Sequence, residues 1–201
     1  MADTLHDVPL FPLGTVLFPD GMLPLKIFEA RYMDMAKACL KDGAPFGVCL
    51  IVSGRETGAP ALPHAVGTLA RIENWDMPQL GVLHVQCRGG ERFRILAKRI
   101  ESSGLQRADI ELLAADDHEP LSASHDILGE LMSRIIDNID DTTPLQPVRL
   151  DDAVWVSWRL ADLLPMSPAE KQAVLELDNC AARLDRVHRF LHEKGLLKPS
   201  R

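Results

Sequence analysis

Two hydrophobic periodicities divide the chain. Up to residue 113, apolar residues form short alternating or continuous runs separated by glycine and proline, a pattern typical of β-strands. Beyond residue 121, they recur every three or four positions, as in amphipathic helices. The polar stretch AADDHEP at residues 114–120 lies between the two patterns. We therefore expect an α+β fold, with a β-rich part over residues 1–118 and a helical part over residues 119–201.

The β-rich part is predicted to hold seven strands and one helix. The strands are expected at residues 8–11, 23–28, 46–52, 66–75, 82–88, 92–100 and 106–113. Strands at this spacing, joined by short turns, favour a curled sheet or a small barrel. Pro12 and Pro24 lack the amide hydrogen that a strand ladder needs. The first strand is therefore predicted to end at Pro12, since it must either lie at an edge or end at once, and the second is predicted to be an edge strand. The helix is predicted over residues 29–41, where apolar side chains share one face.

Two loops of the β-rich part are candidates for function. Residues 53–64 (SGRETGAPALPH) form a predicted loop of 12 residues, and a loop of that length is usually functional or mobile. Residues 76–81 (DMPQLG) are predicted to be a hairpin loop that carries Met77 and Leu80.

The helical part is predicted to hold four helices, at residues 121–140, 153–164, 168–177 and 180–194. Asp151 and Asp152 are expected to cap the second helix, and Asn179 the fourth. Ser167 and Glu170 have the spacing of a capping box and predict the start of the third.

Composition narrows the class of protein. The chain has 201 residues and a net charge of 22 − 29 = −7, which disfavours binding to nucleic acid or to an anionic membrane by bulk electrostatics. The four cysteines form no CxxC pair, so we expect reduced thiols in a cytoplasmic protein. No apolar run approaches 18 residues, and the N-terminus lacks a basic region followed by an apolar one. We therefore predict neither a transmembrane span nor a signal peptide.

The stretch PLFPLGTVLFPDGMLPLKIFEARY at residues 9–32 is the most distinctive in the chain. Further short motifs follow in order: FGV at residues 46–48, VGTLARI at 66–72, GGERFRI at 89–95, LP at 164–165 and EKQ at 170–172. Together they resemble the Lon N-terminal domain family, the substrate-recognition region at the start of Lon proteases that also occurs in stand-alone proteins. The resemblance implies a PUA-like pseudo-barrel followed by a helical bundle, and a bacterial source.

The resemblance implies recognition without proteolysis. No GxxxxGK[ST] loop is present, so hydrolysis of ATP by a P-loop is not expected, and the chain has no room for the protease domain. We therefore expect no enzyme activity and no cofactor. The expected partner is an unfolded polypeptide or another protein.

The remaining candidates for chemistry are weak. His188 and His192 lie one helical turn apart, but no third metal ligand has suitable spacing, so no metal site is predicted. The serines lack a GxSxG context, and the acidic cluster at residues 116–119 is expected to be a solvated linker. A hydrolase site made of a cysteine and a histidine brought together in space stays open as an alternative.

A second alternative is RNA binding through the PUA-like barrel. The basic residues concentrate on the strands at residues 82–100 and are Arg88, Arg92, Arg94, Lys98 and Arg99. Alternation predicts that Arg92, Arg94 and Lys98 share a face, and a solvated outer face is the simpler interpretation.

Recognition of an unfolded chain needs exposed apolar surface with adaptable side chains. On this ground the predicted binding residues in the two loops are Ala61, Leu62, Met77 and Leu80, with Trp75 beside them. Trp155 and Trp158, three apart on a predicted helix, are expected either in the core or in an apolar peptide groove.

Overall fold

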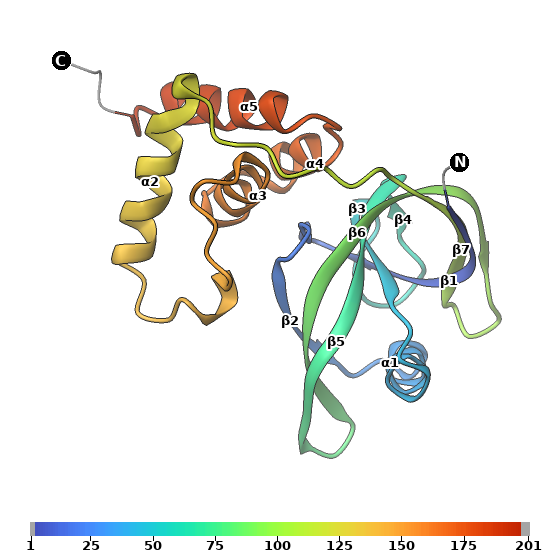
Figure 1. Ribbon diagram of the computed structural model, residues 1–201. Helices are drawn as coiled ribbons and strands as arrows, with labels where there is room; N and C mark the ends of the chain where they lie inside the picture. The colour runs from blue at the N-terminus through green and yellow to red at the C-terminus, as the bar shows by residue number, and fades with distance from the viewer. Residues whose placement is uncertain (1–2, 198–201) are drawn as a thin grey trace. The chain divides into compact units, whose positions relative to one another are not determined.

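The structure, a computed structural model, describes residues 3–197. The chain divides into two compact units, Met1–Ala115 (unit 1) and Asp116–Arg201 (unit 2), and each is described by itself (Figure 1). Unit 1 is rich in β-strands and unit 2 is helical, which confirms the predicted α+β class.

Unit 1 contains a single sheet and a single helix. Its strands are β1 (Thr4–Leu13), β2 (Met22–Ile27), β3 (Phe46–Ser53), β4 (Leu62–Pro63), β5 (Val66–Gln79), β6 (Val82–Ile100) and β7 (Gln106–Leu112), and its helix is α1 (Ala30–Asp42). The strand order is β1-β7-β6-β5-β3-β4. A parallel pairing of β1 with β3 closes β1, β7, β6, β5 and β3 into a small barrel. β2 lies outside this barrel and pairs only with β6, as predicted for an edge strand.

β1 differs from its prediction. It runs through Pro9 and Pro12 to Leu13, so it does not end at Pro12, and it has a partner strand on each side. The partners use different stretches of β1, because β7 pairs from Thr4 to Leu10 and β3 pairs from Leu10 to Leu13. Pro12 therefore lies where only one neighbour is paired, and a missing amide hydrogen is tolerated there.

β6 is one strand of 19 residues rather than the two that were predicted. Gly89 lies inside it, and a Cβ at this position would overlap the carbonyl oxygen of Phe18. The amide of Gly89 donates to the Gly21 carbonyl, and the Gly89 carbonyl accepts from the Asp20 amide, each over 2.8 Å. β2 pairs with β6 only before this point and β7 only after it. Gly89 and the adjacent Gly90 thus mark the point at which β6 changes its partner from β2 to β7.

Two buried clusters form the core of unit 1. The cluster inside the barrel consists of Val8, Leu10, Cys49, Leu69, Phe93, Ala108 and Ile110. No space is left for a side chain at Gly67, where a Cβ would overlap the Val48 carbonyl oxygen and lie 2.9 Å from the Phe93 ring. Neighbouring residues of β1 and β3 point the other way, into the second cluster, which explains why both strands are apolar on both faces.

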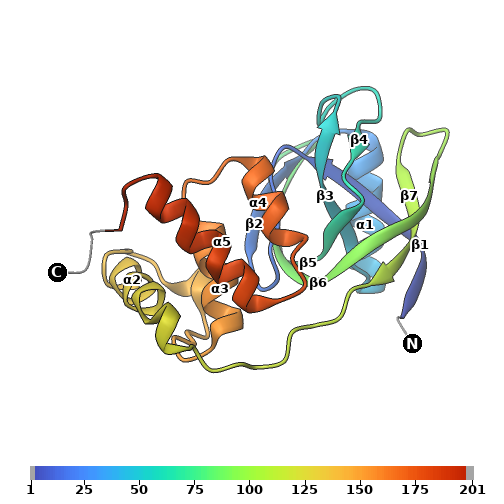
Figure 2. The same ribbon diagram turned by 90° about the horizontal axis from the view of Figure 1, so that it is seen from above.

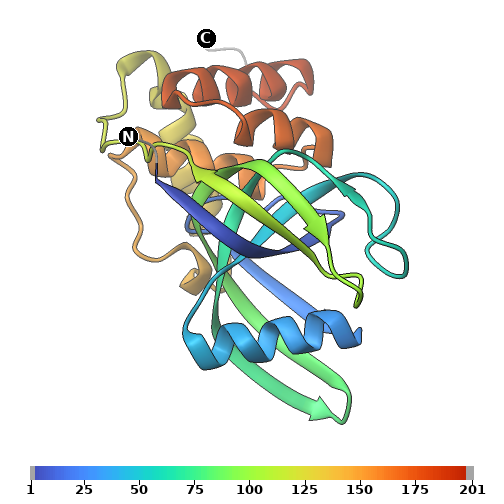
Figure 3. The same cartoon turned by 90° about the vertical axis from the view of Figure 1, so that its right-hand side faces the viewer.

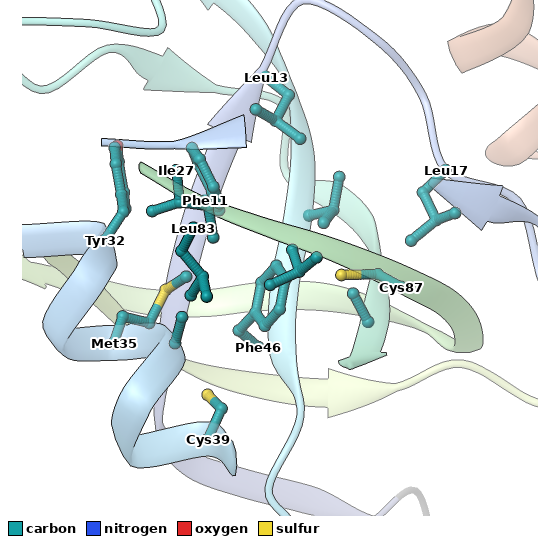
Figure 4. Close-up of a cluster of buried hydrophobic side chains, with 14 of the residues drawn as sticks. Phe11, Leu13, Leu17, Ile27, Tyr32, Met35, Cys39, Phe46, Leu83 and Cys87 are labelled. Atoms are coloured by element: carbon teal, nitrogen blue, oxygen red, sulfur yellow. The ribbon is translucent and has the colours of Figure 1, made fainter. Parts of the chain in front are cut away.

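The second cluster packs α1 against the sheet (Figure 4). Tyr32 and Phe11 stack with ring centroids 3.9 Å apart, and Met35 and Cys39 follow on the same face of the helix. These are residues predicted from the helical period, and the expected helix is confirmed. Figures 1 and 3 show α1 beside the long hairpin of β5 and β6.

Unit 2 is a bundle of four α-helices with two short 3-10 turns. The helices are α2 (Asp126–Asp137), α3 (Ala153–Leu163), α4 (Pro168–Leu175) and α5 (Cys180–Glu193). α3 contacts each of the other three (Figure 2). Asp152, Ser167 and Asn179 cap α3, α4 and α5 as predicted. The first predicted helix is shorter than expected, because the residues before Asp126 form a 3-10 turn.

A buried arginine joins the parts of this bundle. Arg183 on α5 donates from Nε to Ser157 Oγ over 3.1 Å and from Nη2 to Asp116 Oδ2 over 2.8 Å. Its guanidinium lies 3.8 Å from the centroid of the Trp158 ring. Within residues 3–197, no helix is both long and apolar enough to cross a membrane.

The two adjacent glycines of β6 provide a matched test of this architecture. Gly89→Ala should lower the free energy of unfolding by about 1–3 kcal/mol, because its Cβ must displace the Phe18 carbonyl. Gly90→Ala should change it little, because the nearest atom to its Cβ would be 3.6 Å away. Urea unfolding followed by circular dichroism compares the two. Equal stability of both variants would show that the close approach at Gly89 is not needed.

Candidate functional site

The hairpin of β5 and β6, with β2 along its side, forms a three-stranded arm of unit 1 (Figure 1). The predicted loop at residues 76–81 is mostly part of this arm, because β5 continues to Gln79 and only Leu80 and Gly81 form the turn. The arm therefore holds Met77 on β5 and Leu80 in the turn that follows it.

Strand register places apolar side chains together on one face of the arm. Leu25 pairs with Val85, and Val85 pairs with Trp75, so the three side chains form a row across the strands. Leu23, Cys87 and Ile72 form the neighbouring row in the same way. Side chains from these rows belong to the cluster beneath α1 or pack against it.

Towards its tip, the arm exposes apolar side chains to solvent. Val85 is buried, but Trp75, at the same level of the arm, is 59% exposed. Met77 and Leu80 follow towards the tip and are 38% and 93% exposed. We call these three residues the arm surface. Three large apolar side chains so exposed within six positions are more than scattered surface residues require, and they indicate a binding surface.

The other predicted binding residues lie elsewhere. Leu62 on β4 is half exposed, but Ala61 is buried and its carbonyl accepts a hydrogen bond from Gln106 Nε2 over 2.7 Å. Trp155 and Trp158 are buried within unit 2, at 5% and 4% exposure. The structure therefore brings together Trp75, Met77 and Leu80, and it places the two helical tryptophans in a core, where they offer no surface for a ligand.

The sequence did not predict that Leu23 and Leu25 belong to the apolar face of the arm. Their alternation with Pro24 and Lys26 predicted an edge strand, which is correct, but it did not show which strand they join. Only the register with β6 places them in one row with Trp75.

The basic residues of β6 do not form a continuous cationic path. Arg92 is 4% exposed, which contradicts the interpretation of Arg92, Arg94 and Lys98 as a solvated outer face. Arg88 pairs with Glu73 over 2.7 Å, and Arg99 pairs with Asp7 and Glu101. Acidic partners thus offset the charge that an RNA backbone would need.

Unit 2 contains one hydrogen-bonded row of serine, histidine and aspartate. Ser122 Oγ lies 3.0 Å from His125 Nδ1, and His125 Nε2 lies 2.9 Å from Asp185 Oδ1. The row ties the turn before α2 to α5. Ser122 is only three residues before His125 and begins the same 3-10 turn, so their hydrogen bond is a local contact within that turn. It gives no support to the hydrolase alternative. Across residues 3–197, no group of three or more His, Cys, Asp or Glu side chains could hold a metal ion.

The four cysteines are buried and unpaired. Burial raises the pKa of Cys49 and of Cys87 to about 12. Burial, together with a hydrogen bond to Glu119 Oε2 over 2.8 Å, raises the pKa of Cys180 to about 11. A thiol acts as a nucleophile in its ionised form, so these cysteines are poorly suited to catalysis near neutral pH.

This burial predicts slow thiol chemistry in the native protein. At pH 8, the thiolate fraction of Cys180 should be roughly a hundredfold lower than that of an unfolded cysteine, because the native pKa is higher by about two units. Reaction with a chromogenic disulfide reagent should therefore be slow in buffer, should accelerate as pH rises towards 11, and should be fast for all four thiols in urea. A native thiol that reacts at the unfolded rate at pH 8 would contradict the assignment.

Comparisons with known proteins agree on one family. Residues 7–193 match the family described as the ATP-dependent protease La (LON) substrate-binding domain. The Lon protease of Paraburkholderia phytofirmans is 30% identical over 195 residues, which cover 91% of this chain and 24% of that protein. The chain thus spans about a quarter of the length of this relative. Protein cereblon of Gallus gallus is 28% identical over 120 residues, 55% of this chain and 26% of that protein.

Solved structures show the same fold. A crystal structure of a Lon N-terminal domain protein from Xanthomonas campestris has a TM-score of 0.79 and 34% identity, and covers 92% of this chain and 99% of that one. The N-terminal domain of a Lon protease of the Mycobacterium avium complex has a TM-score of 0.64, at 17% identity, over 95% of this chain and 99% of that one.

Proposed function

This chain belongs to the family of Lon substrate-binding domains, and from that premise we propose that it binds unfolded polypeptide segments through the arm surface and catalyses no reaction itself. The observation that carries the proposal is the exposure of Trp75, Met77 and Leu80 on one arm of unit 1. Membership of the family supports a polypeptide as the partner. The strand register, which places Trp75 beside Val85 and Leu25, supports the arm as the binding surface.

The side chains of the arm surface suit recognition of many sequences. Methionine is flexible and polarizable and adapts to ligands of different shape. Tryptophan offers a large apolar area with few rotatable bonds, so little conformational entropy is lost on binding. The half-buried Leu23 and Leu25 extend the apolar face from Trp75 across β6. A bound segment would therefore find apolar contact along the arm and not in a single pocket.

The arm is also firmly anchored. Its strands are continuous with the barrel through β5 and β6, and its inner rows are held by the cluster beneath α1. A rigid platform reduces the entropy lost on binding. The proposal includes a cytoplasmic location, which the four unpaired thiols support.

A charge substitution on the arm tests the proposal. Met77→Lys with Leu80→Lys should weaken binding of reduced, carboxymethylated α-lactalbumin, a permanently unfolded polypeptide, by at least about tenfold. Burial of a methionine or leucine side chain is worth about 1.5–3 kcal/mol, and tenfold corresponds to about 1.4 kcal/mol. Isothermal titration calorimetry gives the affinities.

The matched control is Ile100→Lys, because Ile100 is 58% exposed on β6 but lies outside the arm. It should bind as the parent does. An unchanged affinity in the arm variant, or an equal loss in the control, would show that the arm is not the binding surface. Salt-sensitive retention of an RNA oligonucleotide, lost on neutralising Arg94 and Lys98, would favour the RNA-binding alternative instead.

A further inference from the structure

A groove separates β1 from α1 in unit 1, apart from the arm surface. Its volume is about 350 Å³, and it is lined by β1, by α1, by the turn that follows α1 and by Arg107 of β7. Pockets that enclose whole small molecules measure about 300–1,000 Å³, so this groove is at the lower end and suits one or two side chains.

One wall of the groove is a strand edge without a strand partner. β7 pairs with β1 from Thr4 to Leu10, whereas β3 joins the other edge only from Leu10 onward. Over residues 4–9, that second edge has no strand beside it within the described chain and borders the groove. A strand edge facing a helix across an apolar groove is the arrangement in which an extended peptide adds to a sheet.

The ladder available to such a peptide is short. The register of β1 with β7 shifts between Leu5 and Val8, where Asp7 has a positive φ of 58°. Pro9 has no amide hydrogen to donate. The shift and the proline prevent a long strand from pairing here, as in other protected edges. They leave room for a segment of a few residues, held mainly by its side chains.

The floor of the groove is apolar. Val8, Met35 and Cys39 line it and are buried, and Leu5 on the rim is 36% exposed. Burial raises the pKa of Cys39, so its thiol adds to the apolar lining as a neutral group. One leucine or phenylalanine side chain of a ligand would find contact here on several sides.

The charge at the rim is negative. Asp42 lines the groove at the last residue of α1 and has no ion-pair partner among residues 3–197. The helix dipole disfavours an anion at this end by about 0.3–1 kcal/mol, so Asp42 does not serve the stability of α1. The second acidic residue, Asp7, is already held by Arg99 and Arg107. Asp42 therefore remains available to a cation from outside.

We propose that this groove, the β1–α1 groove, is a second peptide subsite that takes a short extended segment with an apolar side chain on its floor and a lysine or arginine beside Asp42. The inference rests on the proposed function, because it gives the polypeptide partner a sequence preference. It assigns general apolar contact to the arm surface and selection of basic, apolar segments to the groove.

The experiment uses two probes that differ in one charge. Acetyl-Leu-Leu-Lys-Leu-amide should perturb the backbone amide NMR signals of β1 and the C-terminal half of α1, and should bind about two- to fivefold more tightly than acetyl-Leu-Leu-Glu-Leu-amide, as expected for an exposed ion pair. Asp42→Lys should reverse this preference. The variant should stay folded, because a cation is favourable at a helix C-terminus.

Two further variants separate the groove from the rest of the surface. Ala38→Trp fills the groove from the exposed side of α1 and should abolish binding of both peptides. Asp34→Lys is the matched control for charge, because Asp34 lies on the same helix, is exposed and does not line the groove. It should keep the preference for the lysine peptide.

Several results would overturn the inference. They are no binding of either peptide to the parent protein, the same preference before and after Asp42→Lys, or binding that survives Ala38→Trp. Perturbation of the groove signals by protein concentration alone would point to a second copy of this chain as the occupant. In each case the affinity of carboxymethylated α-lactalbumin for the arm variant decides separately whether the proposed function stands.

Discussion

The close approach of the Phe18 carbonyl to Gly89 is the constraint on which the rest of unit 1 depends. The segment at residues 18–21 bonds to the backbone of Gly89 through both its amide and its carbonyl. Because this segment occupies the edge of β6, β2 must leave that edge and β7 takes its place beyond it. One strand can thus serve both the barrel and the arm.

This division explains how a small unit can have a full core and still expose large apolar side chains. The barrel interior is closed by the pairing of β1 with β3 and filled by Phe93 and its neighbours. The arm leaves the barrel at Gly89, and only its inner rows lie against the cluster beneath α1. Beyond these rows, Trp75, Met77 and Leu80 are exposed towards the tip of the arm. This open end is the surface at which we propose that polypeptide binds.

Most elements could be predicted from local patterns, and most errors concern where separate segments meet. The helical period of α1 and the caps of α3, α4 and α5 are local signals, and they are confirmed. Gly89 and Gly90 resemble a turn locally, and only the distant Phe18 makes them a change of partner within one strand. The prediction that β1 ends at Pro12 is wrong, because β3 replaces β7 as the partner of β1 at Leu10. The local sequence carries no signal of this change of partner.

The same limit applies to the candidate site. The exposure of Met77 and Leu80 could be predicted, because apolar residues next to a hairpin turn have little chance of burial. Leu23 and Leu25 could not be joined to them without the register of β2 on β6. Trp155 and Trp158 allowed two interpretations, and burial on a helix that is apolar on most sides decides for the core.

The central claim is that unfolded polypeptide binds at the open end of the arm. The most direct test is a methyl NMR spectrum of protein labelled with ¹³C at the methionine methyl groups, recorded with and without unlabelled carboxymethylated α-lactalbumin. Met77 is exposed on the arm, whereas Met132 and Met166 are buried in unit 2 and serve as internal references. The account predicts a shift or broadening of the Met77 signal, with Met132 and Met166 unchanged. Saturable binding that leaves the Met77 signal unperturbed would contradict it.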